Sequence, residues 1–413
     1  MADWLKEFRS KRGASVDIAH LTRTPPFAAG SFTRIVANVM QRMTAYRQLA
    51  ISNWDRPLPE NPGEAVIVVS RRNLALWRKL ALKLPTRLRS RLFHGIGGRG
   101  CLAYIWQALE ALRVVRPKIV VCYDEPWMGR IVRRGIDWPC RVIFYQHGLS
   151  YFLSTEEAAA MYSLNAFDSI WTLTTASYRF DRARMPYYEP TVRVVPNPID
   201  TEMFHVASDE LRGRVRASWN LPSDRPVVLF LSVLRAKKGA HLLVQAWPEV
   251  LRQVPHAFLW IVGGGEPGYE RYLRQMVQAL GVQDSVRLQG RVDWQQTPSC
   301  YQAADVYAFP TTFVEGMPLA LGESLACGLP CVASDHLVSR EAYGDGGVEF
   351  VPDPNLEGAF AGPLVELLSD AARRRSLGEK GRDYLVRRYS YATILPLMQQ
   401  AYSRELSYVQ GLA

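Results

Sequence analysis

The chain lacks any apolar run long enough to span a membrane as a helix. A spanning helix needs about 20 consecutive, mostly apolar residues, and no run of 18 or more occurs in these 413 residues. Residues 1–13 (MADWLKEFRSKRG) also contain no apolar core of the kind found in export signals. We therefore expect a protein that stays in the cytoplasm.

Paired cysteines and metal-ligand spacings are missing as well. None of the six cysteines lies in a C-x-x-C arrangement, which argues against a disulfide framework and against a zinc site. The chain contains no Asp-x-Asp, no H-x-x-E-H and no paired-histidine spacing. We therefore expect reduced thiols, no metal and no cofactor. The six cysteines are Cys101, Cys122, Cys140, Cys300, Cys327 and Cys331.

Acidic residues are absent from one long stretch of a chain whose formal net charge is +11. Residues 71–99 contain nine Lys or Arg and no Asp or Glu, with leucines at near-helical spacing among them. Such a segment is typical of peripheral contact with an anionic membrane, here on its cytoplasmic face. The alternative is a solvated helix that covers a domain core. No aromatic–basic interleaving accompanies the charge, so we expect no nucleic-acid partner.

What the chain does contain is a regular alternation of strand-like and helix-like segments, the pattern of parallel sheets with crossover helices. We predict an α/β protein with two Rossmann-like, doubly wound domains, 1–200 and 201–389, facing across a cleft. Ligands of such sheets bind at the carboxyl ends of strands, so the loops there should carry the chemistry. The predicted strands are 16–21, 65–69, 119–123, 142–145, 169–173 and 192–195, then 227–232, 258–262, 286–288, 306–309 and 331–333.

The most informative of these loops follows the fourth predicted strand of the second set. Residues 310–334 read PTTFVEGMPLALGESLACGLPCVAS and place Glu315 and Glu323 eight positions apart. A helix is predicted from Pro318, because proline is favoured at the first helical position. Its expected N-cap, Met317, has no side-chain oxygen, so the first amides stay open to an anion. Carboxylates around such a site suit a ligand with phosphate in the middle and hydroxyls at both ends, which describes a nucleotide-sugar.

Paired glutamates near a helix start are often only solvated, and the flanking residues decide between the two readings. The block resembles the signature of the retaining glycosyltransferase family 4, which has the GT-B fold: P-S/T, then E-G-x-x-x-x-x-x-E-A-x-A-x-G-x-P-V-V-A. The chain departs from that pattern by small or near-isosteric residues at Gly322, Ser324 and Cys331. The resemblance covers 192–402 well and the N-terminal half loosely. It implies a terminal helix, 390–413, that crosses back to the first domain.

A second loop supplies positive charge. Residues 233–239 (VLRAKKG) follow the first strand of the second set and precede a helix. Cations beside a helix N-terminus can clamp a diphosphate, and arginine can bind it through two hydrogen bonds. Resembling proteins carry G-R-x-x-x-x-K-G here: Lys238 matches the lysine, Val233 stands at the arginine position, and Arg235 is the expected substitute. The alternative is a solvated basic cap.

Four further positions match the family less specifically, and a fifth is placed by its strand alone. Gly264 matches the glycine-rich turn near the nucleotide, and Arg291 lies in the segment whose main chain contacts the base. Gly30 matches the loop that closes over the diphosphate. His147 ends a strand and matches the histidine near the transferred sugar, although a lone histidine is more often structural. Asp124 follows another strand and is expected on the acceptor side.

The resemblance implies a retaining, metal-independent hexosyltransferase. Its donor would be a nucleotide-diphosphate sugar, with uridine the commonest base. The acceptor would be a glycan, a lipid-linked molecule or a small molecule, in cell-surface polysaccharide synthesis. In this hypothesis Glu315 and His147 are catalytic, and Glu323 holds the ribose. The sugar or distal phosphate would lie against Gly316, Met317, Pro318 and Leu319.

Two other hypotheses stay open at this point. A nucleotide-sugar epimerase or a sugar phosphorylase could use the same fold. An epimerase would need several carboxylates in the N-terminal half, however, and Asp124 and Glu125 alone do not supply them. A degenerate, membrane-associated scaffold is favoured by Val233 and disfavoured by the intact Glu315 and Lys238. Donor hydrolysis by the purified protein separates a transferase from a scaffold.

Overall fold

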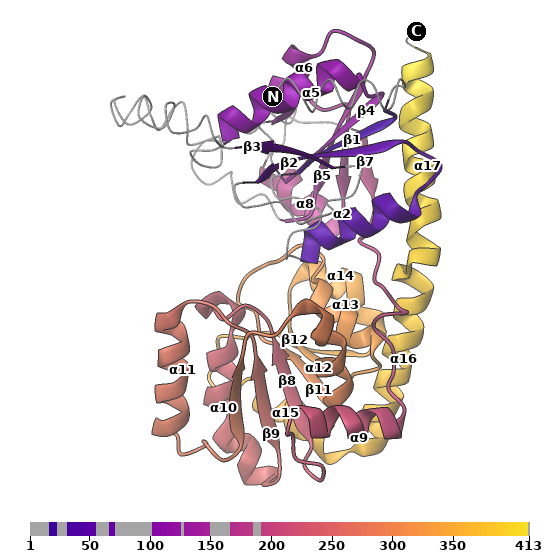
Figure 1. The fold of residues 1–413 in the computed structure, drawn as a ribbon. Coiled ribbons are helices and arrows are strands. Elements are labelled where there is room, and N and C mark those ends of the chain that lie inside the picture. The colour runs from indigo at the N-terminus through magenta and orange to yellow at the C-terminus, as the bar shows by residue number, and fades with distance from the viewer. Residues whose placement is uncertain are drawn as a thin grey trace, which may run out of the picture. The chain divides into compact units, whose positions relative to one another are not determined.

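The computed structural model describes residues 16–22, 31–54, 66–70, 101–124, 128–148, 166–184 and 191–411. The chain divides into two compact units (Figure 1). The first comprises residues 1–196 together with 395–413, and the second comprises residues 197–394. The sequence placed these boundaries after residues 200 and 389.

The first unit is built on a seven-stranded sheet in the order β3-β2-β1-β4-β5-β6-β7, with every pairing parallel. The central strands β1, β4 and β6 are buried along their whole length, as expected for a parallel sheet covered on both faces. The strands are β1 (Ile18–Thr22), β2 (Gln48–Trp54), β3 (Val66–Ser70), β4 (Ile119–Tyr123), β5 (Arg141–Gln146), β6 (Ser169–Thr172) and β7 (Thr191–Val194). The helices are α2 (Ser31–Arg42), α5 (Cys101–Val115), α6 (Met128–Gly135), α8 (Thr175–Arg184) and the part of α17 (Tyr391–Gln410) from Leu395 onward.

The second unit is built on a six-stranded parallel sheet in the order β10-β9-β8-β11-β12-β13. Its strands are β8 (Val227–Leu231), β9 (Phe258–Val262), β10 (Val286–Gly290), β11 (Val306–Phe309), β12 (Cys331–Ser334) and β13 (Val348–Val351). Its α-helices are α9 (Asp209–Ser218), α10 (Ala240–Gln253), α11 (Pro267–Ala279), α12 (Thr297–Ala303), α13 (Leu319–Ala326), α14 (Leu337–Tyr343), α15 (Ala361–Ser369) and α16 (Ala371–Tyr389). Three short 3₁₀ turns, η4 (Ala236–Lys238), η5 (Trp294–Gln296) and η6 (Gly344–Gly346), lie between them.

The strand order of the second unit reverses at its centre. From β8 the chain runs outward on one side through β9 and β10, and then returns to β11 on the other side. This is the doubly wound order, in which the loops after the two central strands part and leave a crevice at the carboxyl edge. The loops after β8 and β11 include the two from which the sequence predicted the donor site, 233–239 and 310–318.

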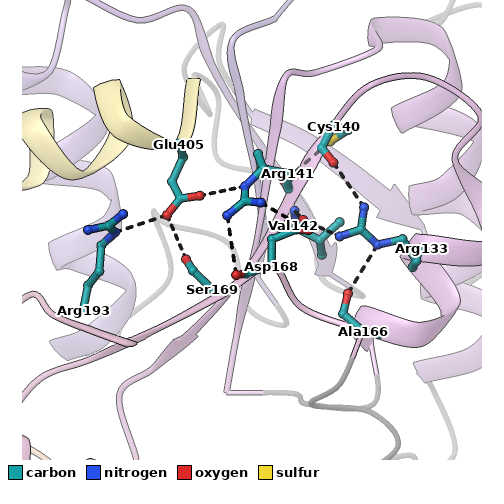
Figure 2. Close-up of polar contacts among 9 residues, drawn as sticks. All are labelled: Arg133, Cys140, Arg141, Val142, Ala166, Asp168, Ser169, Arg193 and Glu405. Atoms are coloured by element: carbon teal, nitrogen blue, oxygen red, sulfur yellow. Dashed lines mark hydrogen bonds and ion pairs between the residues drawn. The ribbon is translucent and has the colours of Figure 1, made fainter. Parts of the chain in front are cut away.

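The C-terminal helix of the first unit is fastened to the sheet by a buried carboxylate. Glu405 is fully buried in α17 and accepts hydrogen bonds from Arg141 (2.9 Å) and Arg193 (3.2 Å), as Figure 2 shows. The hydroxyl of Ser169 donates a third, at 3.0 Å. These partners lie on β5, β7 and β6. Because a buried charge is costly unless it is paired and hydrogen-bonded, this network fixes the register of α17 on the sheet.

The predicted α/β class with two Rossmann-like sheets is confirmed, and two strands were missed. The β2 segment (QLAISNW) shows neither a strict alternation of polar and apolar residues nor a continuous apolar run, so its sequence does not predict a strand. The edge strand β13 (VEFV) is only four residues long and carries a charge. In both cases pairing with a neighbouring strand, rather than the local pattern, makes the segment extended.

Candidate active site

The two selected loops meet through an ion pair. The Nζ atom of Lys238, in η4 after β8, lies 2.5 Å from Oε1 of Glu315, in the loop after β11. Only 17% and 20% of the two side chains are exposed, so the pair is screened less than a surface pair would be. The sequence separates these residues by 77 positions. The doubly wound topology brings them together at the reversal of strand order.

The backbones of the same two loops are in direct contact. The amide of Thr312 donates to the carbonyl oxygen of Lys237 at 3.0 Å. Gly239 has a φ of +78°, and a Cβ there would lie 1.8 Å from the carbonyl oxygen of Pro310. Only glycine combines this left-handed conformation with such a close approach. The glycine after Lys238 is therefore required by the contact that holds Lys238 beside Glu315.

Helix α13 begins one residue later than the sequence predicts. Pro318 is the N-cap, with extended backbone angles (φ −73°, ψ 112°), and Leu319 is the first helical residue. This corrects the assignment of Met317 as N-cap and Pro318 as first residue. The proline ring fixes only φ, and the N-cap depends on ψ.

Despite this shift, the N-terminus of α13 has no side-chain cap, as the sequence predicts. Its first turn also contains no acidic residue. By helix geometry the amides of Leu319 and Ala320 have no intrahelical acceptor, and both residues are only partly buried. These amides and the helix dipole favour an anion. Gly316 and Met317 precede them, Met317 being buried at 4% exposure.

Helix α10, which follows β8, differs from α13 at its N-terminus. The hydroxyl of Tyr269, from α11, accepts the amide of His241 at 3.2 Å and lies 2.9 Å from Nδ1 of the same residue. The amide of Leu242 donates to the carbonyl oxygen of Gly239 at 2.9 Å. Internal groups thus occupy the first turn of α10, whereas α13 offers its first turn to a ligand.

Glu323 lies one turn inside α13. Its Oε2 atom accepts a hydrogen bond from the hydroxyl of Tyr301, in α12, at 3.2 Å. Burial, followed by the charge of Glu323, raises the pKa of Tyr301 well above its ordinary value, so the phenol remains a donor at neutral pH. Glu323 is partly exposed, and each of its carboxylate oxygens can accept more than one hydrogen bond.

The glycine-rich turn after β9 packs against the loop after β8. The amide of Leu234 donates to the carbonyl oxygen of Gly264 at 3.1 Å. A Cβ at Gly264 would lie 3.1 Å from the Cβ of Arg291, at the end of β10. The side chain of Arg235 is exposed, and its Nε atom lies 3.5 Å from Oε1 of Glu266. The structure therefore brings the backbones that carry Gly264 and Arg291 together, and gives Arg235 an acidic neighbour of its own.

His147 belongs to the first unit and lies at the carboxyl end of β5. Its backbone amide donates to Oδ1 of Asp124 at 2.6 Å, and the amide of Gly148 donates to the same oxygen at 2.9 Å. Its ring lies between aromatic neighbours, 4.3 Å from Tyr145 and 5.4 Å from Tyr123 between ring centroids. Burial raises the pKa of Asp124, with the two amides opposing that shift. Asp124, expected on the acceptor side, anchors the turn that carries His147.

Some expectations fall outside the described residues or stay untested. Gly30, Glu125 and the basic segment 71–99 lie outside the described ranges. Within those ranges, no three His, Cys, Asp or Glu side chains gather as metal ligands would. In the same part of the chain, no helix is both long and apolar enough to cross a membrane.

Three residues around the site were missed. Tyr301 orients Glu323, His336 contacts the loop after β11, and Tyr343 contacts the start of α13. His336 follows the predicted strand 331–333 and could have been selected on that ground. The two tyrosines lie within helices, where the sequence gives no sign of what their hydroxyls contact.

Comparison with known proteins relates part of the second unit to a family. Residues 212–384 match the family model described as "Glycosyl transferases group 1". A GDP-mannose-dependent alpha-(1-6)-phosphatidylinositol monomannoside mannosyltransferase of Mycolicibacterium smegmatis is 33% identical over 205 residues, which cover 48% of this chain and 53% of that protein. An uncharacterized glycosyltransferase of Methanocaldococcus jannaschii is 25% identical over 303 residues, 69% of this chain and 75% of its own length. The chain thus spans about half the length of the first of these relatives.

Solved structures share the fold over nearly the whole chain. Anabaena HepE in complex with UDP superimposes with a TM-score of 0.75 at 17% identity, covering 94% of this chain and 100% of HepE. WaaG, a glycosyltransferase involved in lipopolysaccharide biosynthesis, gives 0.65 at 15% identity, covering 93% and 98%. Identities this low support the architecture alone. Residues 212–384 thus match the glycosyl transferases group 1, and the chain has the two-domain GT-B fold.

Proposed function

We propose that this chain transfers a sugar from a nucleotide-diphosphate sugar to an acceptor hydroxyl, with retention of anomeric configuration and without a metal. The observation that carries the proposal is the position of the Lys238–Glu315 pair beside the open N-terminus of α13, at the reversal of strand order. A cation, a carboxylate and free amides within one crevice match the charges of such a donor.

Each part of the donor then has a partner. The diphosphate lies between Lys238 and the first amides of α13, with Arg235 as a more exposed second cation. Glu323, held by Tyr301, accepts hydrogen bonds from the ribose hydroxyls. Glu315 contacts the hydroxyls of the donor sugar and stabilises positive charge near its reacting carbon. The backbones at Gly264 and Arg291 lie along the nucleoside side.

The transfer exchanges one C–O bond for another at the same carbon. The bond between the anomeric carbon and the diphosphate oxygen breaks, and the acceptor oxygen forms its bond from the same face. The acceptor proton passes to the departing phosphate oxygen. Lys238 and the helix amides stabilise the negative charge on that leaving group. His147 donates a hydrogen bond to a hydroxyl of the sugar, and no protein side chain needs to act as nucleophile.

Two kinds of relative bear on the base of the donor. The sequence favoured uridine as the commonest base, and a structural neighbour was solved with UDP. The names of the more similar mannosyltransferases specify GDP-mannose. The acceptor is proposed to be a glycan or a lipid-linked molecule of the cell envelope, because the first relatives act on a phosphatidylinositol mannoside.

A thermal-shift assay with UDP, GDP, ADP and their sugars, with and without EDTA, tests the donor site. A ligand at one hundred times its dissociation constant stabilises the fold by about 2.7 kcal/mol. We expect one base to raise the melting temperature, EDTA to leave that shift unchanged, and Glu323→Ala to abolish it. The exposed Glu379→Ala, in α16, serves as the matched control. No shift with any nucleotide would contradict the proposal and favour the degenerate scaffold.

Product analysis then separates the reaction classes on this fold. Incubation of the donor without acceptor gives slow hydrolysis for a transferase and an isomeric nucleotide-sugar for an epimerase. Incubation with inorganic phosphate and a glycan gives a sugar phosphate for a phosphorylase. The configuration of the transferred sugar, read by NMR, decides retention.

A further inference from the structure

The loop that carries Glu315 is held at both of its ends by one segment of the chain. This segment is 336–343, which consists of helix α14 and the residue before it. Nε2 of His336 lies 2.9 Å from the carbonyl oxygen of Thr311, before Glu315. The hydroxyl of Tyr343 donates to the carbonyl oxygen of Pro318, after Glu315, at 3.1 Å. Residues 312–317 therefore lie between two fixed points.

The first fixed point also connects the loop to Lys238. A carbonyl oxygen only accepts hydrogen bonds, so Nε2 of His336 must carry the proton in this contact. Thr311 is buried, and its hydroxyl donates to the carbonyl oxygen of Lys237 at 3.2 Å. His336 thus holds the backbone of Thr311 at the point where the loop of Glu315 contacts the loop of Lys238.

The second fixed point lies at the N-cap of α13. The carbonyl oxygen of Pro318 accepts the amide of Gly322 at 3.3 Å in addition to the phenol of Tyr343. A Cβ at Gly322 would lie 2.8 Å from the Tyr343 hydroxyl oxygen, so a larger side chain at this position would clash with the phenol. Burial raises the pKa of Tyr343 well above its ordinary value, which keeps the hydroxyl protonated and able to donate.

We propose that His336 and Tyr343 are positioning residues for the transfer reaction, because they fix the Glu315 loop against Lys238 and the open start of α13. The inference rests on the proposed function in that it assigns a catalytic purpose to this bracing. Neither side chain needs to touch the donor. Both act through backbone carbonyls, and their effect should therefore appear in turnover more than in nucleotide affinity, which depends on Lys238 and the helix amides.

The test compares Tyr343→Phe with a matched control, Tyr384→Phe. Tyr384 is also buried, and its hydroxyl also donates to a backbone carbonyl, that of Ala342, at 2.9 Å. Each variant loses one hydroxyl from the same region of the fold, so we expect similar small decreases in melting temperature. Only Tyr343→Phe should accelerate hydrogen–deuterium exchange of residues 312–317. Only it should lower kcat, by about ten-fold, while the nucleotide dissociation constant stays within about two-fold.

A second pair of variants tests the other end of the loop. His336→Ala removes the donor to Thr311, and His336→Gln restores an N–H at the end of a side chain of similar reach. We expect His336→Ala to reproduce both effects of Tyr343→Phe and His336→Gln to recover part of each. Exchange of residues 312–317 that is the same in wild type, Tyr343→Phe and His336→Ala overturns the proposal, whatever happens to activity.

The two readouts separate this proposal from the proposed function. Faster exchange in Tyr343→Phe with kcat equal to that of Tyr384→Phe means that the bracing has no catalytic purpose, and overturns the positioning role. A wild-type chain that neither binds nucleotide nor transfers sugar overturns the proposed function, and the positioning role with it. Exchange measured on that same inactive chain still decides whether His336 and Tyr343 hold the loop.

Discussion

Lys238 and Glu315 neutralise each other across the carboxyl ends of β8 and β11, at 2.5 Å. The cation proposed for the diphosphate therefore has an anionic partner within the chain itself. In the proposed function, a donor takes over that partner role and thereby releases the carboxylate of Glu315 toward the sugar. Binding of the diphosphate and placement of Glu315 are thus two consequences of one exchange of ion-pair partners.

This exchange predicts opposite effects of Glu315→Gln on two measurable quantities. Removing the competing carboxylate should tighten binding of the free nucleoside diphosphate by about ten-fold or more, because a charged hydrogen bond contributes about 1.5–3 kcal/mol and is no longer broken. The same variant should lower kcat strongly, because the carboxylate near the reacting carbon is gone. Isothermal titration calorimetry and initial rates measure the two. Lys238→Met, as the control, should weaken binding, and equal weakening in Glu315→Gln would contradict the partner exchange.

The open N-terminus of α13 makes a second prediction, again with effects of opposite sign. Ala320→Asp places a carboxylate in the first turn, where its interaction with the helix dipole should stabilise the folded chain by about 0.3–1 kcal/mol. The same carboxylate accepts hydrogen bonds from the amides proposed for the phosphate and repels the phosphate charge. Nucleotide affinity should therefore fall at least ten-fold. Ala320→Asn, which lacks the charge, should reduce affinity less. Chemical denaturation and calorimetry give the two values. Unchanged affinity in Ala320→Asp would place the phosphate elsewhere.

The loops of the site were predictable from the sequence because their character is local. Lys238 and Glu315 each follow a short apolar run, and such runs form the parallel strands whose carboxyl ends share one edge. What the sequence could not predict is which side chains fix these loops, since Tyr343 reaches Pro318 over 25 positions through tertiary packing.

The departures from the family signature show the same limit. Ser324 and Cys331 seemed two independent small changes, yet Ser324 Oγ and Cys331 Sγ lie 3.1 Å apart in the buried space between α13 and β12. Gly322 faces the hydroxyl of Tyr343. Each departure is matched by a neighbour that the linear pattern does not reveal. The pattern identifies the site, and the three-dimensional contacts explain its exceptions.

Asp124 makes a third prediction, because one oxygen anchors the turn of His147. Oδ1 accepts both the His147 and the Gly148 amides, and Asp124 itself has a φ of +53°, a conformation that Asp adopts more readily than most residues. Asp124→Asn keeps an oxygen for both amides, whereas Asp124→Ala leaves them without it. We expect Asp124→Ala to lower kcat about ten-fold and Asp124→Asn to retain most of it.

Nucleotide binding is the internal control for that pair, since the donor site is built from the second unit and should be unaffected in both variants. Steady-state rates and calorimetry on the same preparations measure the two properties. If Asp124→Asn lost as much turnover as Asp124→Ala, the charge of Asp124 would be the important property, and the anchoring of the turn would not.

The last prediction concerns stability in acid and rests on His20, which is 1% exposed in the middle of β1. Nε2 of Gln48 donates to the carbonyl oxygen of Met43 at 2.9 Å, so its Oε1 faces Nε2 of His20 at 3.0 Å. His20 therefore carries its proton on Nε2, and its bare Nδ1 accepts the hydroxyl of Tyr123 at 2.9 Å. A second proton on Nδ1 would remove that acceptor.

Burial lowers the pKa of His20 from 6.5 to about 4, with the Gln48 contact opposing the shift. Between those two pH values the unfolded chain binds the proton and the folded chain does not, so stability falls as the pH falls from 6.5 toward 4. A difference of this size corresponds to about 3 kcal/mol in the free energy of unfolding. His20→Gln keeps a donor and an acceptor but cannot titrate, and its urea unfolding should lose this pH dependence. Parallel pH profiles for His20→Gln and wild type would show that His20 is not the group that titrates.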